Sequence, residues 1–421
     1  MRGSLLIKNA SQLVTCSGFQ AKKGDEMNVL GVIEDGALLI EDGIITALGP
    51  TGDILERFDE RGLAGEGFTV IDAEGKAVLP GFVDSHTHFV FDGYRADEFS
   101  WRLQGVSYME ILRRGGGILN TVSATRKASE ESLIASGKRR LDSMLSYGVT
   151  TVEGKSGYGL DRVTEIKQLA AMAALDRTHP MDVASSFLGA HAVSADYRGK
   201  EDAYIDFMIE SVLPEVSRQR LAEFCDIFCE KGVFSIEQSR RLLTAAKQSG
   251  LKIKLHADEI VPLGGAELAA ELGAVSADHL LHCSDQGIRD LAAAGVIATL
   301  LPATAFSLRE PYARAREMID HGCAVALATD FNPGSCFTES IPLVFALATL
   351  YMKMTAEEAV TALTLNGAAA LDRADTIGSL DVGKKGDAVV LSYPSYRFLP
   401  YRIGVNCVEQ VVKSGVRCFK R

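Results

Sequence analysis

The sequence predicts a (β/α)₈ TIM-type barrel with a small β-sandwich domain formed by both termini. Two observations support this fold class. Residues 77–330 alternate short apolar runs with amphipathic segments, over a length that is usual for such a barrel. Both ends of the chain instead carry short strand-like segments separated by turn residues. With 421 residues and 47% apolar content, the chain can bury one large core and a smaller one.

The small domain is predicted from the two ends of the chain together. Near the N-terminus, alternating apolar and polar residues indicate an antiparallel β unit, with segments at 4–8, 37–41, 44–48 and 69–72. The C-terminal part repeats this pattern at 388–391, 408–413 and 416–419. Because neither end is long enough to form a stable sandwich alone, we expect them to pair. The predicted division is 1–78 and 376–421 for the small domain, and 79–375 for the barrel.

Eight apolar runs are the predicted barrel strands. They lie at residues 77–83, 150–153, 182–188, 226–228, 251–255, 274–277, 296–301 and 324–328. Amphipathic segments such as 129–147 and 235–249 separate most of them and are typical of helices. A doubly wound sheet is the alternative topology, but the G-x-G-x-x-G and G-x-x-x-x-G-K-[ST] motifs of such folds are missing. The glycines at 115–117 are expected to form a flexible loop.

Charge and cysteine usage argue against several classes of protein. The net charge is -11 with no block of five like charges, which does not suit a nucleic-acid or anionic-membrane partner. No run of 18 apolar residues occurs, and the N-terminus lacks the core of a signal peptide. The eight cysteines are scattered and form no C-x-x-C motif, which favours free thiols. We therefore expect a cytoplasmic protein with no membrane and no nucleic-acid partner.

Polar residues that directly follow the apolar runs are the candidates for an active site, because barrel enzymes place catalytic groups at the C-terminal ends of their strands. Five of the eight histidines occupy such positions, which random placement would seldom produce. They are His86, His88, His191, His256 and His279. The other polar residues at these ends are Glu153, Lys155, Tyr158, Glu230, Glu259, Thr304 and Asp330.

The histidine pattern predicts a metal site. His86 and His88 are two residues apart on a strand, so both imidazoles point to the same face. With His256 and Asp330 they form a nitrogen and oxygen donor set that suits zinc or ferrous iron. Such an ion lowers the pKa of bound water toward ~7. Singly, each residue is more often structural or a loop cap; the four together favour a metal. Glu259 and His279 are the candidate acid–base groups.

Two further charged residues each allow two interpretations. Lys155 could be a carbamate-type metal ligand, but it follows the second strand rather than the fourth, which favours a salt bridge or a site-orienting role. Glu230 could bridge a second metal or pair with a cation such as Lys231. A structural role for Glu230, or a supporting role beside the metal ligands, is favoured instead.

Several motifs taken in order resemble the imidazolonepropionase family of the amidohydrolase superfamily. They are PGFVDSHTHFVFDGYR, LQGVSYMEILRRGGGILNTV, GKSGYGLD, FLGAHAV, KLHADEI, VSADHLL, YARAREMID and ATDFNPGS, and they cover about residues 81–371. The resemblance implies a cytosolic homodimer with one zinc or iron ion per chain. It also implies hydrolysis of a C–N bond in 4-imidazolone-5-propanoate, a small substrate with a carboxylate side chain, to give N-formimidoyl-L-glutamate.

The resemblance also implies roles for individual residues. The metal ligands would be His86, His88, His256 and Asp330. The residues facing substrate or product would be Arg95, Tyr158, His191, Glu259, Asn332, Gly334 and Ser335. His279 would assist the chemistry, and Glu259, with Asp330 or His279, would carry the proton from the attacking water to the departing ring nitrogen. Arg95 suits a carboxylate because its guanidinium offers a bidentate fork; its other possible role is a surface salt bridge.

Two other functions stay open at this stage. One is another cyclic amidohydrolase, or an aminohydrolase acting on a nucleobase, with the same fold and metal. The other is a non-catalytic, urease-like scaffold protein, which would bind no metal. Arg95 and Tyr158 favour the carboxylate-bearing substrate over the first, and measured metal content separates the enzyme from the second.

Overall fold

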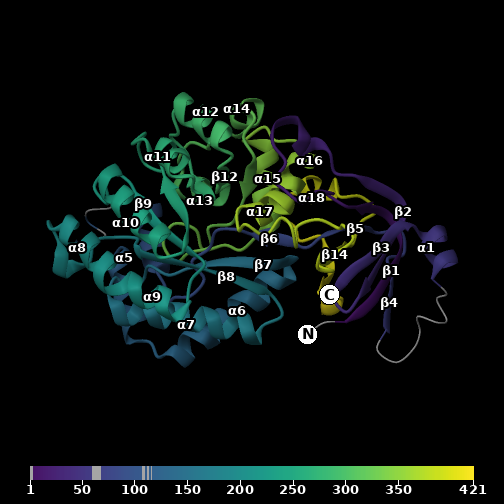
Figure 1. The fold of residues 1–421 in the computed structure, drawn as a ribbon, viewed down its shortest axis with the longest axis horizontal. Helices are drawn as coiled ribbons and strands as arrows, with labels where there is room; N and C mark the ends of the chain where they lie inside the picture. Colours follow the sequence, from purple (N-terminus) through teal and green to yellow (C-terminus); the bar gives the residue numbers. More distant parts are fainter. Residues whose placement is uncertain (1–2, 59–67, 107–109, 111–112, 115) are drawn as a thin grey trace.

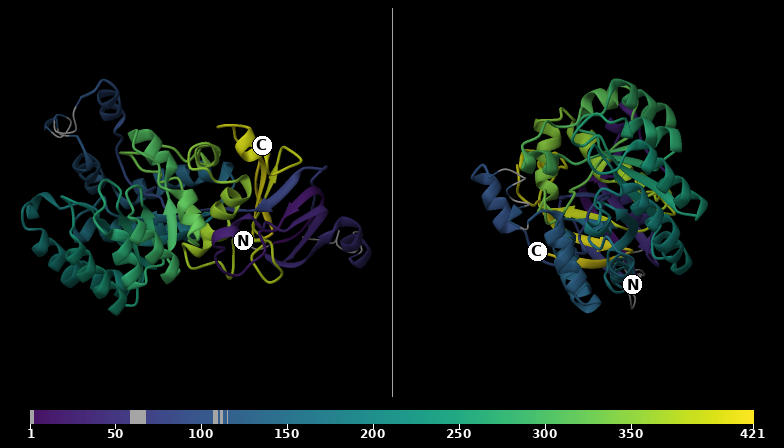
Figure 2. Two further views of the ribbon diagram at one scale, coloured as in Figure 1. Left: turned by 90° about the horizontal axis from the view of Figure 1, so that it is seen from above. Right: turned by 90° about the vertical axis from the view of Figure 1, so that its left-hand side faces the viewer.

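The computed structural model describes residues 3–58, 68–106, 110, 113–114 and 116–421. Two bodies lie side by side (Figure 1), a large α/β barrel and a smaller β domain that contains both chain ends. The predicted fold class is therefore confirmed. Helix α3 (Ala96–Leu103) belongs to a segment that stands out from the barrel in the left view of Figure 2.

The barrel contains eight parallel strands that are neighbours in strict chain order. They are β6 (Phe82–Asp84), β7 (Val149–Lys155), β8 (Asp182–Ala190), β9 (Phe224–Cys229), β10 (Lys252–Ala257), β11 (Ser276–His279), β12 (Ile297–Leu300) and β13 (Val325–Leu327). Nearly every residue in them is buried, as expected where helices cover a parallel sheet. Each strand matches one of the eight predicted runs.

Helices follow the strands and enclose them, as the right view of Figure 2 shows. Those of the barrel are α5 (Ile118–Lys127), α6 (Glu130–Ser146), α7 (Arg162–Thr178), α8 (Glu201–Phe207), α9 (Leu213–Gln219), α10 (Ile236–Gln248), α11 (Gly265–Leu272), α12 (Asp285–Ala294), α13 (Pro302–Leu308), α14 (Ala315–Asp320), α15 (Ile341–Leu350), α16 (Ala356–Leu363) and α17 (Leu365–Ala369). The remaining helices are η1 (Gly24–Asn28), α1 (Thr51–Arg57), η2 (Ala195–Tyr197), η3 (Met208–Val212) and α18 (Phe398–Tyr401).

Local sequence signals explain where the two predicted helices begin. The Ser129 hydroxyl accepts a hydrogen bond from the Ser132 amide at the start of α6. At the start of α10, Ser235 and Gln238 form a capping box in which each side chain pairs with the other's backbone. These caps satisfy amide groups that have no partner inside the helix.

The small domain is one mixed sheet that recruits strands from both ends of the chain. Its strand order is β16-β15-β14-β5-β1-β2-β3, with β4 also paired to β1. The strands are β1 (Ser4–Val14), β2 (Val32–Glu41), β3 (Ile44–Pro50), β4 (Phe68–Asp72), β5 (Ala77–Pro80), β14 (Ala388–Leu391), β15 (Val408–Lys413) and β16 (Val416–Lys420). One apolar cluster joins side chains of the N-terminal strands, such as Leu5 and Ile40, to Val390 and Val412 of the C-terminal strands.

Two expectations about strands were wrong. The run 77–83 is two strands rather than one, since β5 pairs with β1 and β14 in the small sheet and only β6 belongs to the barrel. The N-terminal unit is not purely antiparallel, because β4 and β5 both pair with β1 in parallel. The predicted flexible loop at 115–117 includes Gly115, which lies outside the described residues.

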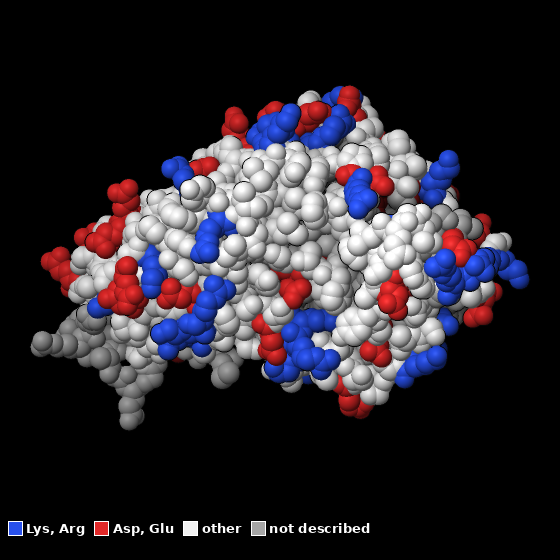
Figure 3. Space-filling view, turned by 180° about the vertical axis from the view of Figure 1, so that it is seen from behind, with Lys and Arg blue, Asp and Glu red and all other residues white. Residues whose placement is uncertain are grey.

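A partly buried ion-pair group joins the two bodies. Asp182, the first residue of β8, lies 2.8 Å from Nζ of both Lys385 and Lys413, and Lys413 also pairs with Asp387 at 2.7 Å. On the outer surface, the face in Figure 3 carries both signs of charge interspersed. Within the described residues, no helix is long and apolar enough to cross a membrane.

Candidate active site

The barrel closes at the point where the predicted metal ligands lie. The segments that follow β6 and β13 pair with each other: the Asp330 amide donates to the His86 carbonyl at 3.0 Å, and the His88 amide donates to the Phe331 carbonyl at 2.9 Å. We call these paired segments, 84–88 and 329–331, the seam. They bring His86 and His88 of the first strand next to Asp330 of the last.

The five strand-end histidines form one buried cluster. The ring centroids of His86 lie 5.3 Å from those of His88 and His279, and 4.6 Å from that of His256. His191 stacks on His88 at 5.0 Å. Burial lowers the pKa of four of these imidazoles, that of His191 to about 3, and so keeps them neutral. Neutral imidazoles are the form that binds a metal ion.

The unpaired atoms of this cluster fit a metal ion. Among the described residues, His86 Nε2, His256 Nε2 and Asp330 Oδ1 are buried without any hydrogen-bond partner. Two sets of donor atoms lie close enough to share an ion, and His86 belongs to both: one adds His88 and Asp330, the other His256 and His279. Buried polar atoms without partners are costly unless a ligand satisfies them. The donor chemistry therefore supports a metal ion at this position.

Two carboxylates that sequence analysis missed hold the far side of the imidazoles. Asp278 Oδ2 lies 2.6 Å from His86 Nδ1, and Asp226 Oδ2 lies 2.9 Å from His256 Nδ1. A carboxylate at Nδ1 accepts the ring proton's hydrogen bond and so fixes the tautomer, which leaves the lone pair of Nε2 free to bind a metal ion. For His256, burial alone would lower the pKa, but Asp226 outweighs it and raises the pKa above its usual value.

Beneath these carboxylates lies a fully buried group of charges. Lys155 Nζ lies 2.9 Å from Glu153, 2.8 Å from Asp226 and 3.4 Å from Asp278, so it forms the salt bridges that its position predicted. Lys254 Nζ pairs with Glu153 at 2.6 Å. The third set of close donors, His86, Glu153 and Asp278, is thus already neutralised by lysines.

Asp330 is positioned by an unusual backbone and by one hydroxyl. Its φ is 52°, in the left-handed region that few non-glycine residues adopt, and His279 at the end of β11 has a φ of 76°. Thr304, in the first turn of α13 after β12, donates its hydroxyl to Asp330 Oδ2 at 2.6 Å. Oδ1 therefore remains free, 3.5 Å from His88 Nε2 and 3.6 Å from His86 Nε2.

Glu259 meets the cluster at His279. Its Oε2 is 3.6 Å from His279 Nε2. Burial, together with Asp330 and Glu230, raises the pKa of Glu259 to about 8. The Glu230 carboxylate itself accepts hydrogen bonds from the amides of Lys231 and Ile260, each at 2.8 Å, which agrees with the favoured structural role.

The loop that carries Tyr158 is held by a single buried carboxylate. Glu165 accepts hydrogen bonds from the amides of Gly157, Gly159 and Leu160 at 2.8–3.0 Å. On its inner side, the loop brings Tyr158 within 5.9 Å of the His88 ring and 5.3 Å of the His191 ring, measured between centroids.

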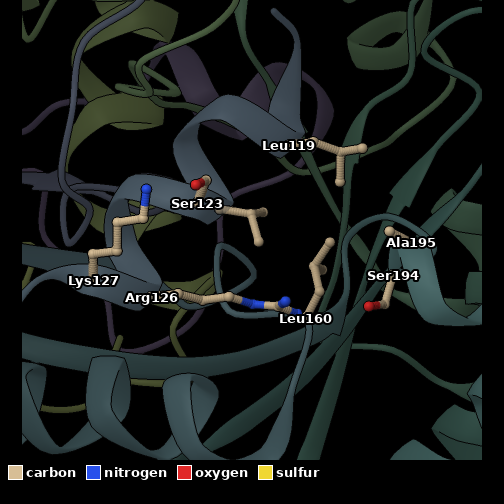
Figure 4. A pocket seen from close by; sticks show the side chains of 8 residues that line it. Leu119, Ser123, Arg126, Lys127, Leu160, Ser194 and Ala195 are labelled. Carbon is tan, nitrogen blue, oxygen red and sulfur yellow. The ribbon is translucent and has the colours of Figure 1, made fainter. Parts of the chain in front are cut away.

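A small cavity of about 260 Å³ lies behind this loop, between α5 and residues 194–195. Figure 4 shows Arg126 and Leu160 next to each other in it. The Arg126 guanidinium is already engaged, with Asp161 at 2.7 Å and the Gly159 carbonyl at 2.8 Å. The cavity therefore belongs to the support of the Tyr158 loop.

Arg95 lies at the wall of a second, larger cavity of about 810 Å³, which the turn at 333–338 and α3 also line. Its Nε pairs with Glu98 at 2.9 Å, which is the predicted alternative salt bridge, but the terminal nitrogens are not used by that contact. Nη1 occupies the place that a Cβ on Gly334 would take, so a side chain there would have to displace the guanidinium. Arg95 is thus held beside the turn that contains Gly334 and Ser335.

The Asn332 side chain organises this turn from within. Its Oδ1 accepts hydrogen bonds from the amides of Gly334 and Ser335 at 2.8 Å, and its Nδ2 donates to the Asp330 carbonyl at 2.8 Å. These hydrogen bonds therefore tie the turn to the backbone of Asp330, whose side chain is a predicted metal ligand. The site consists of an imidazole–carboxylate centre with Arg95, Tyr158 and His191 around it, a plan that suits hydrolysis of a small anionic molecule.

One signal would have revealed the missed residues. Asp226, Lys254 and Asp278 interrupt apolar strands whose other residues are almost all uncharged. A charge inside a buried strand is costly unless it is paired, so such interruptions predict a partner. Lys254 lies two residues before the strand-end His256, and Asp278 lies one residue before His279. The partner of Asp226 is His256, which lies on the next strand.

Comparisons with known proteins agree with this geometry. The model of the amidohydrolase family matches residues 77–418. An imidazolonepropionase of Clostridium tetani is 62% identical over 420 residues, which cover 100% of this chain and 99% of the relative. Another imidazolonepropionase, from Parabacteroides distasonis, is also 62% identical and covers 98% of each chain.

Solved structures show the same fold at low identity. An adenosine deaminase from Xanthomonas campestris with bound zinc has a TM-score of 0.70 at 20% identity and covers 99% of this chain and 92% of its own. A guanine deaminase from C. acetobutylicum, with guanine bound, has a TM-score of 0.70 at 14% identity, over 99% of this chain and 100% of its own. At these identities the likeness concerns the fold alone.

Proposed function

The chain belongs to the imidazolonepropionases of the amidohydrolase family, and on that premise we propose that its barrel hydrolyses 4-imidazolone-5-propanoate to N-formimidoyl-L-glutamate, in histidine degradation. The observation that carries the proposal is a buried imidazole–carboxylate centre with Tyr158 beside the His88 ring and with Arg95 seated on the turn that Asn332 ties to the Asp330 carbonyl. The centre suits attack of water on a carbonyl carbon, and the arginine suits the propanoate group.

The proposed cofactor is one Zn²⁺ or Fe ion per chain. His86, His88, His256 and Asp330 would hold it: His86 lies close to His88 and Asp330 in one set of donor atoms and to His256 in the other, and His86 Nε2, His256 Nε2 and Asp330 Oδ1 have no hydrogen-bond partner. When bound, the ion acts as a Lewis acid at the ring carbonyl and lowers the pKa of the attacking water. Imidazole nitrogens with one carboxylate oxygen are donors that both metals accept.

The proposed proton carrier is Glu259. Its pKa of about 8 is close enough to neutrality for the carboxyl group to accept and release a proton during one turnover. Glu259 would take a proton from the attacking water and deliver it to the departing ring nitrogen. His279, 3.6 Å away, would assist by stabilising the charge at Glu259 or at the carbonyl oxygen. Asp330 is the alternative acceptor.

Arg95 is the proposed anchor for the propanoate group. Because Glu98 takes its Nε, the guanidinium is fixed and its terminal nitrogens can pair with a carboxylate. Gly334 and Ser335 would contact substrate or product beside it, and Asn332 would do so or hold their turn in shape. Tyr158 and His191 would close the opposite wall, packed on the His88 ring.

Steady-state assays test this function against its alternatives. We expect turnover of imidazolonepropionate, with little or none of guanine, cytosine or hydantoins, by protein whose metal content is measured on the same sample. Turnover of a nucleobase without turnover of imidazolonepropionate would contradict the proposal. Less than about a third of an ion per chain, even after reconstitution, would favour a non-catalytic scaffold.

A pair of variants assigns the activity to this site. Asp330→Ala should lose both the bound ion and turnover, because the ion loses its carboxylate ligand. Asp372→Ala is the matched control, since Asp372 pairs with Lys252 on the exposed surface. Full activity of Asp330→Ala would remove this centre from the mechanism.

We also propose a homodimer in the cytoplasm. All eight cysteines are free and seven of them are buried, which suits a reducing compartment. Light scattering on the purified protein measures the oligomeric state; a monomer at micromolar concentration would contradict the dimer.

A further inference from the structure

Five charged side chains fill the centre of the barrel below the imidazole cluster, and all are fully buried. They are Glu153 and Lys155 of β7, Asp226 of β9, Lys254 of β10 and Asp278 of β11. Three carboxylates face two ammonium groups, so the group carries a net charge of -1. Burial of so many charges is costly unless each one is paired.

Lys155 occupies the position between the two carboxylates that hold the imidazoles. Its Nζ lies 2.8 Å from Asp226 Oδ2 and 3.4 Å from Asp278 Oδ2. The same two oxygens lie 2.9 Å from His256 Nδ1 and 2.6 Å from His86 Nδ1. Each oxygen is thus shared between the ammonium and one ring.

We infer that Lys155 is a positioning residue of the metal centre: its ammonium fixes Asp226 and Asp278 so that they keep His256 and His86 turned with Nε2 toward the ion. The inference rests on the proposed ligand roles of the two histidines. Asp226 and Asp278 carry like charges and repel each other, and the ammonium between them removes this repulsion. Without it, the carboxylates would separate and the rings would lose their common direction.

The contacts of Lys155 also exclude the carbamate role. Burial would lower its pKa, but Asp226, Glu153 and Asp278 together raise it well above the usual value. A carbamate forms only on a neutral amine. The three carboxylates keep this amine protonated, so it acts as a cation.

Lys254 provides a matched control. It is equally buried, and its Nζ pairs with Glu153 at 2.6 Å and with the Ser85 carbonyl at 3.0 Å. It lies 3.9 Å from Asp278, and no contact with Asp226 is made. Lys155→Met and Lys254→Met therefore remove the same charge and the same volume from one core, but only the first frees both imidazole-holding carboxylates.

The test measures metal affinity by competition of Zn²⁺ with a chelator, together with the visible absorption spectrum of the Co²⁺ form. We expect Lys155→Met to bind Zn²⁺ about 10–100-fold more weakly, the usual cost of losing support behind a ligand, and to change the Co²⁺ bands. Lys254→Met should weaken Zn²⁺ binding clearly less, because Lys155 still pairs with both Asp226 and Asp278 in that variant. Equal losses in the two variants, or unchanged affinity in Lys155→Met, would overturn the inference.

A second set of variants covers the case in which Lys155→Met does not fold. Asp226→Asn keeps the volume of the side chain and should weaken Zn²⁺ binding with the same change in the Co²⁺ bands. Lys155→Arg keeps the charge and should retain part of the affinity lost with Asp226→Asn. Unchanged affinity in Asp226→Asn would contradict the inference. These readouts do not need turnover, so a failure of the proposed substrate leaves them interpretable.

Discussion

The ion pairs that join the barrel to the small domain give a quantitative prediction for Asp182→Asn. Burial alone would raise the pKa of Asp182, but Lys413 and Lys385 outweigh it and lower the pKa from the usual 3.8 to about 2. Each pKa unit corresponds to about 1.4 kcal/mol. The paired carboxylate therefore contributes about 2.5 kcal/mol to the free energy of unfolding at neutral pH.

The pH dependence of this contribution follows from the direction of the shift. A carboxyl whose pKa is lower in the folded state stabilises fully above its unfolded pKa and loses that effect as the pH falls through the folded pKa. The difference between the wild type and Asp182→Asn should thus be constant from pH 7.5 to 5. By pH 3 it should shrink to about half, roughly 1.3 kcal/mol.

Urea unfolding at pH 7.5, 5 and 3 measures this difference. Asp372→Asn is the control, because Asp372 and Lys252 form an ion pair in which both side chains are about half exposed. Such surface pairs contribute roughly 0–1 kcal/mol. Equal losses in the two variants, or a loss from Asp182→Asn that does not change with pH, would refute the reasoning.

Three other changes test the site. Glu259→Gln should keep the metal and reduce kcat roughly 10²–10⁴-fold, measured with metal analysis on the same sample; retained rate would exclude Glu259 as proton carrier. Glu165→Gln should lower the free energy of unfolding in urea by about 3 kcal/mol and reduce kcat/KM about 10²-fold. The Tyr158 loop would lose its charge-assisted hydrogen bonds, and the NH₂ group of the new glutamine would face a backbone amide that is also a donor. Unchanged kcat/KM would separate the loop from catalysis. Gly334→Ala should raise KM about 10-fold at full metal content, because the new methyl displaces Arg95; an unchanged KM would argue against Arg95 as anchor.

The fold was largely predictable because strand and helix periodicity are local properties. All eight barrel strands were located from apolar runs, and the helices at 130–146 and 236–248 from the helical spacing of apolar residues. The run 77–83 shows where local patterns fail. Both halves of it are buried, and only pairing across the chain assigns 77–80 to the small sheet. The parallel pairing of β4 with β1 is equally invisible in the sequence.

The imidazole cluster was predictable, whereas its support was not. Strand-end positions identified the five histidines, because the barrel itself converts a strand end into a position at one face. The pairing of Asp226 with His256 and of Asp278 with His86 depends on which side chains meet across neighbouring strands. Single-sequence patterns do not contain that register. The charges inside apolar strands were visible, but their partners were not.

The seam explains why an H-x-H pair on the first strand needs an aspartate on the last. Thr329 donates its amide and hydroxyl to the Asp84 carboxylate, and Thr87 bridges to Phe331, so the backbone joins β6 to β13 within the segments that carry the ligands. The positive φ of Asp330 then turns its carboxylate toward both imidazoles. The pairing that closes the barrel therefore also fixes how far apart the segments that carry these ligands lie.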